Sequence, residues 1–336
     1  MSDIAAAPEN SRASASRRLG FLAAALAIAA LPMVLTGSYW QTNLTVCAIN
    51  VLLALGLDFI LGYAGQLNLG QSAFYGLGAY VSTLLITRLG VPFWGAFAAG
   101  VAFAGLAGMV LALFAVRLRG HYLAIASLGF AVITYQILLN WISLTQGPLG
   151  IYAIPAPPSI AIPGLPVISF RNPVALFYLV AGFAMIAYFI LDQLVRSPIG
   201  EALTAIREDE VSAASLGINA ALWKVFAFGV GSAVAGAAGG FYGSFVGTLV
   251  PEAFFITESF TILAMVVVGG MGTLIGPVLG AILLTILPEL LRDVGDLRLV
   301  VYGLALTLVV LFMPGGIMQA VGLGAARRRR ASETPR

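Results

Sequence analysis

The stretch SPIGEALTAIREDEVSAASLGINAALWK, residues 197–224, is the one strongly charged block that lies between apolar spans of this chain. Its start is typical of a helix in water. Ser197 can cap the first turn, Pro198 suits the first helical position, and Glu201 lies near the positive end of the helix dipole. Gly217 is a suitable helix end. The charged side chains of interest in the block are Glu201, Arg207, Glu208, Asp209 and Glu210.

An apolar stripe runs through the same block at roughly helical spacing, interrupted by the charged cluster. It consists of Leu203, Ile206, Ala213, Ala214 and Leu216. The pattern predicts an amphipathic helix over 197–217, within an aqueous segment 197–222 between two membrane helices. On charge alone, an ordinary solvated loop is the alternative.

The composition around this block excludes a soluble domain. The chain has 336 residues, of which 60% are hydrophobic and only 9% charged, and its mean hydropathy is +1.00. A soluble domain would be about a quarter charged. We therefore expect one all-α, polytopic transmembrane bundle. The formal charge of +3 does not indicate a nucleic-acid partner, because the basic residues lie at the ends of apolar spans.

Apolar runs of membrane length recur along the chain, since a spanning helix needs ~20 mostly apolar residues. We expect about ten spans on that criterion. They are 19–37, 43–62, 70–88, 91–116, 121–143, 173–192, 224–247, 259–276, 277–291 and 299–314. We interpret 19–37 as an uncleaved span and not a signal peptide, because no A-x-A site lies at the right place. Whether the glycine-rich stretches 62–72 and 269–280 enter the membrane stays open.

The basic residues predict the orientation. With a cytoplasmic N-terminus, all of the 17 basic residues except Arg88, Arg171, Arg292 and Arg298 fall inside, as the positive-inside rule requires. The tail 1–18, the block 197–224 and the basic tail 315–336 are then cytoplasmic, and the last of these would touch anionic lipid headgroups. The proline-rich loop 144–172 faces outward, either as a passive connector or as a surface that meets a delivery protein.

Polar amides interrupt the glycine-rich stretch GYAGQLNLGQSAFYGLGAY, residues 62–80. Gln66, Asn68 and Gln71 are costly in hydrocarbon unless they face protein or water. Two interpretations fit. The stretch is either a broken helix that lines a path or a short cytoplasmic loop followed by a tightly packed helix.

Small residues also recur every fourth position in two places, which favours close helix packing. The first ladder is Gly231, Ala235, Gly239, Gly243 and Gly247, and the second is Gly272, Gly276 and Gly280. Pro277 predicts a break or kink within the second.

The chain lacks the residues that several kinds of chemistry require. His121 is the only histidine and Cys47 the only cysteine, so we predict no metal site, no catalytic site and no intrachain disulfide. Asp58 is expected to be a wet residue near the inner end of its span. Lys224, the only lysine, follows Trp223, so the chain has no Gly-Lys pair for a phosphate-binding loop.

Three stretches carry a family resemblance that covers most of residues 50–290. EALTAIREDEVSAASLGIN resembles the cytoplasmic coupling segment of ABC importer permeases, and more closely that of branched-chain amino acid permeases of the LivM type. The stretch from Gly62 is similar to that family's GYxGQxSLG, with Asn68 where serine is commoner. VVVGGMGTLIGPVLGAIL, residues 266–283, resembles its VxGGxGTxxGPxxGA run.

The resemblance implies a subunit of the bacterial inner membrane without enzymatic activity or cofactor of its own. Its partners would be a second, related permease, two ATPase subunits that bind ATP and Mg, and an external substrate-binding protein. The coupling residues would be Glu201, Arg207, Glu208, Asp209, Glu210 and Gly217. Arg207 would donate to ATPase carboxylates, and Gln66, Asn68 and Gln71 would line the path.

The cargo and the class of protein have alternatives. Branched-chain or other aliphatic amino acids are the usual cargo of the family, and close relatives carry urea and short amides. Aromatic acids are a further alternative. An ion-driven secondary transporter could also use broken helices. A polytopic membrane enzyme would need a reactive constellation that this residue inventory argues against.

Overall fold

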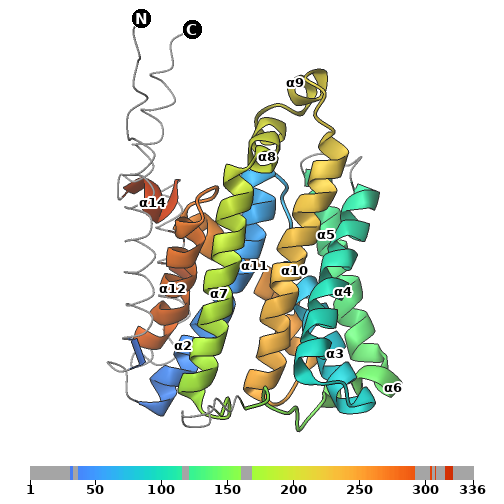
Figure 1. Ribbon diagram of the computed structural model, residues 1–336, viewed down its shortest axis with the longest axis vertical. Helices are drawn as coiled ribbons and strands as arrows, with labels where there is room; N and C mark the ends of the chain where they lie inside the picture. Colours follow the sequence, from blue (N-terminus) through green and yellow to red (C-terminus); the bar gives the residue numbers. More distant parts are fainter. Residues whose placement is uncertain are drawn as a thin grey trace, which may run out of the picture.

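The computed structural model describes residues 31–32, 37–115, 121–159, 169–291, 303–304, 307 and 315–320. Within these ranges the chain is helical, without a β-strand, and the long helices stand side by side (Figure 1). The elements in chain order are α2 (Ser38–Asp58), the π-helix η1 (Phe59–Tyr63), α3 (Gln71–Leu89), α4 (Phe93–Ala115), α5 (His121–Asn140), α6 (Ile142–Thr145), η2 (Gly147–Leu149), α7 (Pro173–Arg196), α8 (Pro198–Glu208), α9 (Glu210–Ser215), α10 (Ala220–Val246), η3 (Pro251–Phe254), α11 (Ile256–Gly269), α12 (Ile275–Leu290) and α14 (Gly316–Ala320).

Five stretches of the described chain are long and apolar enough to cross a membrane. They are Tyr39–Tyr63, Phe93–Phe114, Tyr122–Asn140, Pro173–Arg196 and Ala220–Val246. α11 and α12 are apolar but shorter, with 14 and 16 residues. Each predicted span between residues 43 and 291 has a helical counterpart, so the all-α expectation is confirmed. The predicted spans 19–37 and 299–314 lie almost entirely outside the described residues, and the number of spans stays a prediction.

α10 is the central helix of the bundle and packs against both α3 and α4. Gly231 and Gly239 bring its backbone against Gly56 of α2 and against the Tyr75–Ala79 backbone of α3. Gly236 and Gly240, on another face, meet Ala104 and Phe97 of α4. The predicted packing role is therefore confirmed for Gly231 and Gly239 of the first small-residue ladder, whereas Gly247 ends α10 with φ of 73° and has nothing within 4 Å of an added Cβ. α10 also has a second smooth face that the four-residue spacing did not reveal.

The second small-residue ladder packs against a helix only in part, and the predicted break at Pro277 was wrong. Gly276 and Gly280 do face α11, but Gly272 lies in the turn before α12 with φ of 75°. Pro277 does not break a helix, because it lies in the first turn of α12, where no backbone donor is needed. The break falls earlier, between Gly269 and Ile275.

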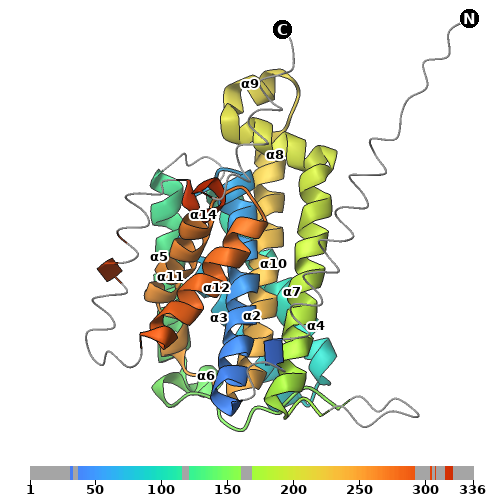
Figure 2. The ribbon, with the colours of Figure 1, turned by 90° about the vertical axis from the view of Figure 1, so that its left-hand side faces the viewer.

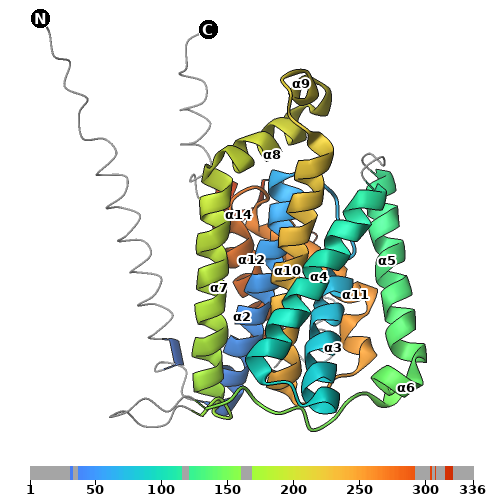
Figure 3. The same cartoon turned by 45° about the vertical axis from the view of Figure 1, so that its right-hand side comes forward.

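The charged block lies at one end of the bundle, and α6 lies at the other (Figures 1 and 3). At the α6 end, Ile151 and Leu249 exchange backbone hydrogen bonds of 2.9 and 2.8 Å, and the Ile154 amide donates to the Gly247 carbonyl at 3.1 Å. The first part of the proline-rich loop is thus held against the chain that follows α10. Residues 160–168 of that loop lie outside the described residues.

Candidate coupling site

The charged block forms two short helices, α8 and α9, which extend beyond the long helices (Figure 2). As predicted, α8 begins at the Ser197 cap, whose Oγ accepts from the Ile199 amide at 3.2 Å, with Pro198 in the first turn. The expectation of one helix to residue 217 was wrong. Asp209 is extended, and its Oδ1 accepts from the Val211 amide at 2.9 Å and the Ser212 amide at 3.3 Å. A side chain that caps the next helix thereby ends the first.

The buried face of α8 seats the helix on the end of the bundle. Gly200, Leu203 and Ile206 are buried. Leu203 is fully buried in an apolar cluster at the bundle end, which we call the α8 seat. The other buried members of the α8 seat are Leu55, Phe59, Tyr63, Ala64, Leu191, Ala227 and Leu274.

The predicted apolar stripe does not continue through α9. Ala213 is buried, but Ala214 is exposed, and 81% of Leu216 is exposed. The break at Asp209 changes the direction of the chain, so the helical spacing of α8 does not carry over to α9. Gly217 ends α9 with φ of 85°, as expected of a helix stop.

The structure divides the predicted coupling charges into two groups. Arg207 Nη1 donates to the Gly62 carbonyl, Asp209 caps α9, and Glu210 Oε1 is 2.8 Å from Lys224 Nζ. These three charges contact this chain. Glu201 and Glu208 are exposed and have no side-chain partner in the described part of the chain.

Hydrogen bonds within this chain lower the pKa of Asp209. The hydroxyl of Ser212 and the amides of Ser212 and Val211 all donate to this exposed carboxylate and favour its charged form. Its pKa lies below the ordinary value of 3.8, so Asp209 is ionised as the α9 cap throughout the neutral range.

Asp58 was expected to be wet, and that expectation was wrong. The side chain is fully buried, and its Oδ1 accepts from the Gly272 amide at 2.8 Å. The π-helix η1 extends α2 beyond Asp58, and the Gly270–Gly272 turn covers the carboxylate. Sequence position suggested an end of the span, but only the contact between two distant glycine turns explains the burial.

The amides of the first glycine-rich stretch face protein. Asn68 Nδ2 donates to Gln71 Oε1 at 3.0 Å, and Asn68 Oδ1 accepts from the Gly70 amide at 2.8 Å. Both side chains are fully buried where an irregular segment over 64–70 leads into α3. Gln66 is also buried, and its Oε1 has no partner in the described part of the chain. A path-lining role for these amides stays a prediction.

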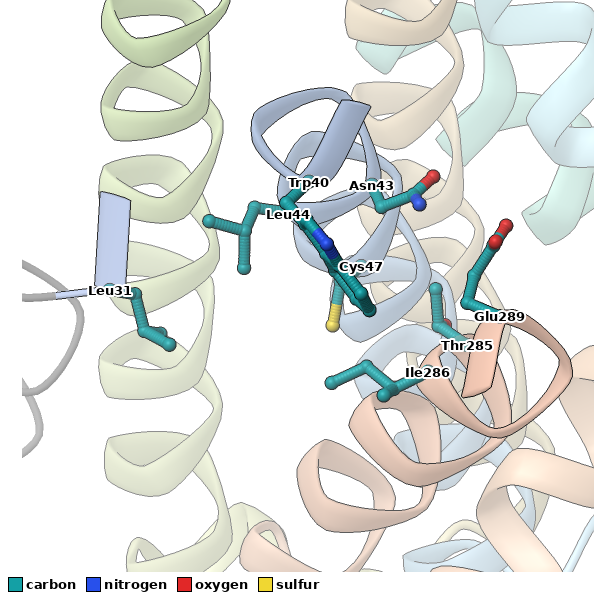
Figure 4. A pocket seen from close by; sticks show the side chains of 8 residues that line it. All are labelled: Leu31, Trp40, Asn43, Leu44, Cys47, Thr285, Ile286 and Glu289. Atoms are coloured by element: carbon teal, nitrogen blue, oxygen red, sulfur yellow. The ribbon is translucent and has the colours of Figure 1, made fainter. Parts of the chain in front are cut away.

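A hollow lies between α2 and α12 (Figure 4). It is lined by Leu31, Trp40, Asn43, Leu44, Cys47, Thr285, Ile286 and Glu289. None of the predicted path residues contributes to it. Among the described residues, no group of acidic, histidine and cysteine side chains has a geometry that could hold a metal ion.

Long apolar helices around a glycine-rich centre, with a charged helix pair outside the spans, define a polytopic helical membrane protein. Comparison with known proteins narrows the class. Residues 39–313 match the family model for the permease component of branched-chain amino acid transport systems, and the chain belongs to this family. No solved structure matches it.

Two kinds of curated relative illustrate the match. The high-affinity branched-chain amino acid transport permease LivM of Escherichia coli K12 is 35% identical over 89% of this chain and 74% of the relative. The high-affinity branched-chain amino acid transport permease BraD of Pseudomonas aeruginosa is 30% identical over 82% of this chain and 93% of the relative. The family resemblance of the three sequence stretches is thus confirmed.

Proposed function

We propose that this chain is a permease subunit of an ATP-driven importer in the bacterial inner membrane and forms half of the path for branched-chain amino acids. The family and the names of both kinds of relative support the cargo. Without a Gly-Lys pair in the sequence, ATP and Mg are bound by two partner ATPase subunits. A second, homologous permease supplies the other half of the path, and an external protein delivers the substrate.

An exposed apolar surface outside the bundle carries the coupling part of this proposal. Val211 of α9, Leu216 just after it and Leu222 in the first turn of α10 are 63%, 81% and 58% exposed. We call these three the α9 patch. The acidic side chains Glu201 and Glu208 are exposed on α8, the helix that precedes α9. Exposed apolar and acidic side chains on the same helix pair outside the membrane spans indicate a protein interface. An ATPase subunit is the partner that this surface fits.

The mechanism follows from the seat of α8 on the bundle. When ATP binding closes the ATPase pair, a partner that holds the α9 patch moves α8. The α8 seat joins that helix to α2, η1, α7 and α10, whose rearrangement switches the side to which the path opens. The switch requires that the ATPase pair contact the two states of the permease differently.

Co-purification of the chain from its native membrane tests the function. We expect two ATPases and a second permease, with uptake in vesicles that depends on ATP. A chain that purifies alone and moves solute without ATP would instead be a secondary transporter, and turnover of a compound by the purified chain would favour an enzyme. Competition with urea, short amides and aromatic acids distinguishes the alternative cargoes.

The α9 patch is tested by Leu216→Ala. Because a few side chains carry most of the binding energy of such interfaces, we expect the variant to weaken ATPase co-purification about tenfold. Leu89→Ala is the matched control, since Leu89 is 71% exposed at the far end of α3. Equal ATPase recovery with both variants would remove the patch from the interface.

A further inference from the structure

Arg207 joins α8 to two glycine turns that are far apart in the sequence. Its Nη1 donates to the Gly62 carbonyl at the end of η1. Beside that contact, the buried Asp58 carboxylate accepts from the Gly272 amide at 2.8 Å. We call Asp58, Gly62, Gly65, Arg207 and Gly272 the Arg207 joint. It connects α2, η1, the α11–α12 turn and α8.

The backbone of both turns is closely packed on the Arg207 side chain. A Cβ at Gly65 would lie 2.8 Å from Arg207 Cγ and 3.1 Å from Arg207 Cβ. A Cβ at Gly272 would lie 2.8 Å from Arg207 Nη1 and 3.0 Å from the Gly62 oxygen. Both glycines have positive φ, 67° and 75°, a conformation that other residues rarely adopt. Glycine at these two positions lets the turns contact both the stem and the head of the arginine.

The joint lies next to the α8 seat. Leu203 precedes Arg207 by one helical turn and is fully buried in that apolar cluster. The combination of buried apolar packing with a directional hydrogen bond one turn later restrains both the position and the rotation of α8. The 64–70 segment leads from Gly65 to the paired amides at the start of α3, so the restraint continues into the bundle.

We propose that Arg207 is a positioning residue of the transport cycle that makes α8, the η1–Gly65 turn and the α11–α12 turn move as one rigid body. The proposal rests on the proposed importer function. It differs from a docking role for Arg207, because the guanidinium acts within this chain. The ATPase moves α8 through the α9 patch, and the Arg207 joint carries that movement to both glycine turns.

A reversible disulfide between α8 and the Gly65 turn tests this proposal. The background variant Cys47→Ala removes the only cysteine. Gly65→Cys with Arg207→Cys then places two thiols on Cβ atoms 3.1 Å apart, so the Gly65 turn has to move outward by a few tenths of an ångström to reach the ~3.5–4.5 Å of a disulfide. In the reconstituted complex with its partners, we expect Arg207→Ala to retain ATPase binding but to lose uptake about tenfold. The reduced double variant should behave in the same way. Its oxidation rejoins α8 to the Gly65 turn but not to the Gly272 turn, and should therefore restore part of the lost uptake.

The comparison of one protein in two redox states cancels the strain of a side chain at Gly65. Gly65→Cys alone reports that strain. Arg196→Ala is the matched arginine control, since within the described ranges the Arg196 side chain pairs with Asp192 one turn away on α7 and not with α8 or a glycine turn. Oxidation that abolishes the remaining uptake would overturn the proposal, because α8 would then have to slide on the turn. Unchanged uptake in Arg207→Ala would also overturn the proposal. A loss of ATPase binding in that variant would overturn it as well, because it would place Arg207 in the partner interface. ATPase binding by the unaltered chain is measured in the same samples, so a failure of the importer function is seen separately.

Discussion

Leu203 is the residue on which the attachment of α8 depends. Its side chain is fully buried among residues of α2, η1, α7 and α10. Leu203→Ala leaves a cavity in that cluster, and we expect a loss of about 2–5 kcal/mol of stability. Thermal unfolding of the solubilised protein measures it, with the exposed Leu89→Ala as control. Equal melting temperatures for the two variants would contradict a stabilising role for the α8 seat.

Asp209 determines where α9 begins. Asp209→Ala removes an acceptor for the Val211 and Ser212 amides, so hydrogen exchange at α9 should become faster. Asp209→Ser retains a capping oxygen and should restore most of the protection. An unchanged exchange rate in Asp209→Ala would show that α9 forms without the cap.

The lowered pKa of Asp209 sets the direction of its pH dependence. Because the folded state favours the charged carboxylate, the cap is fully present above the ordinary aspartate value of 3.8 and is lost as the pH falls through the lower folded value. Exchange at α9, corrected for intrinsic rates, should therefore stay constant from neutral pH to about 5. A protection that changes near pH 7 would contradict the assignment.

At the scale of elements, α10 depends on glycines that have no room for a methyl group. A Cβ at Gly239 would meet the Tyr75 carbonyl and lie 2.7 Å from the Ala79 amide. Neither backbone atom can rotate away, so Gly239→Ala should separate α10 from α3 and lower the melting temperature.

Gly182→Ala is the matched control for that helix contact. Gly182 lies inside α7, and a Cβ added there would have nothing within 4 Å. Alanine at this position gains helix propensity of about 0.5–1 kcal/mol and should be neutral or stabilising. If the two substitutions had the same effect on unfolding, close α10–α3 packing would not be the reason for the glycine ladder.

At the scale of the whole molecule, the basic residues predict that the α8–α9 end is cytoplasmic. Single cysteines in the Cys47→Ala background test this at both ends. Leu216→Cys should react with an impermeant thiol reagent only from the cytoplasmic side. Tyr152→Cys, at a position 60% exposed near the α6 end, should react only from outside. The reverse pattern would reject the orientation and remove α9 from the reach of an ATPase.

The sequence by itself determined the helical class, the positions of the long helices between residues 43 and 291, and the family. These follow from local properties. Apolar runs of membrane length form helices because backbone groups must bond internally in hydrocarbon. Ser197, Pro198 and Gly217 act on the turns next to them, and Glu201 to Glu210 stood out because charge is rare in this chain.

Only the tertiary structure decided what the charged and polar residues contact. Asp58 lies 214 positions from the amide it accepts from, and Arg207 lies 145 positions from the carbonyl it donates to. No periodicity encodes such pairs, because they depend on how two glycine turns meet after the helices pack. For the same reason the contact of the Arg207 guanidinium with the Gly62 carbonyl could not be predicted, while the ATPase contact that the family resemblance implies for Arg207 stays a prediction.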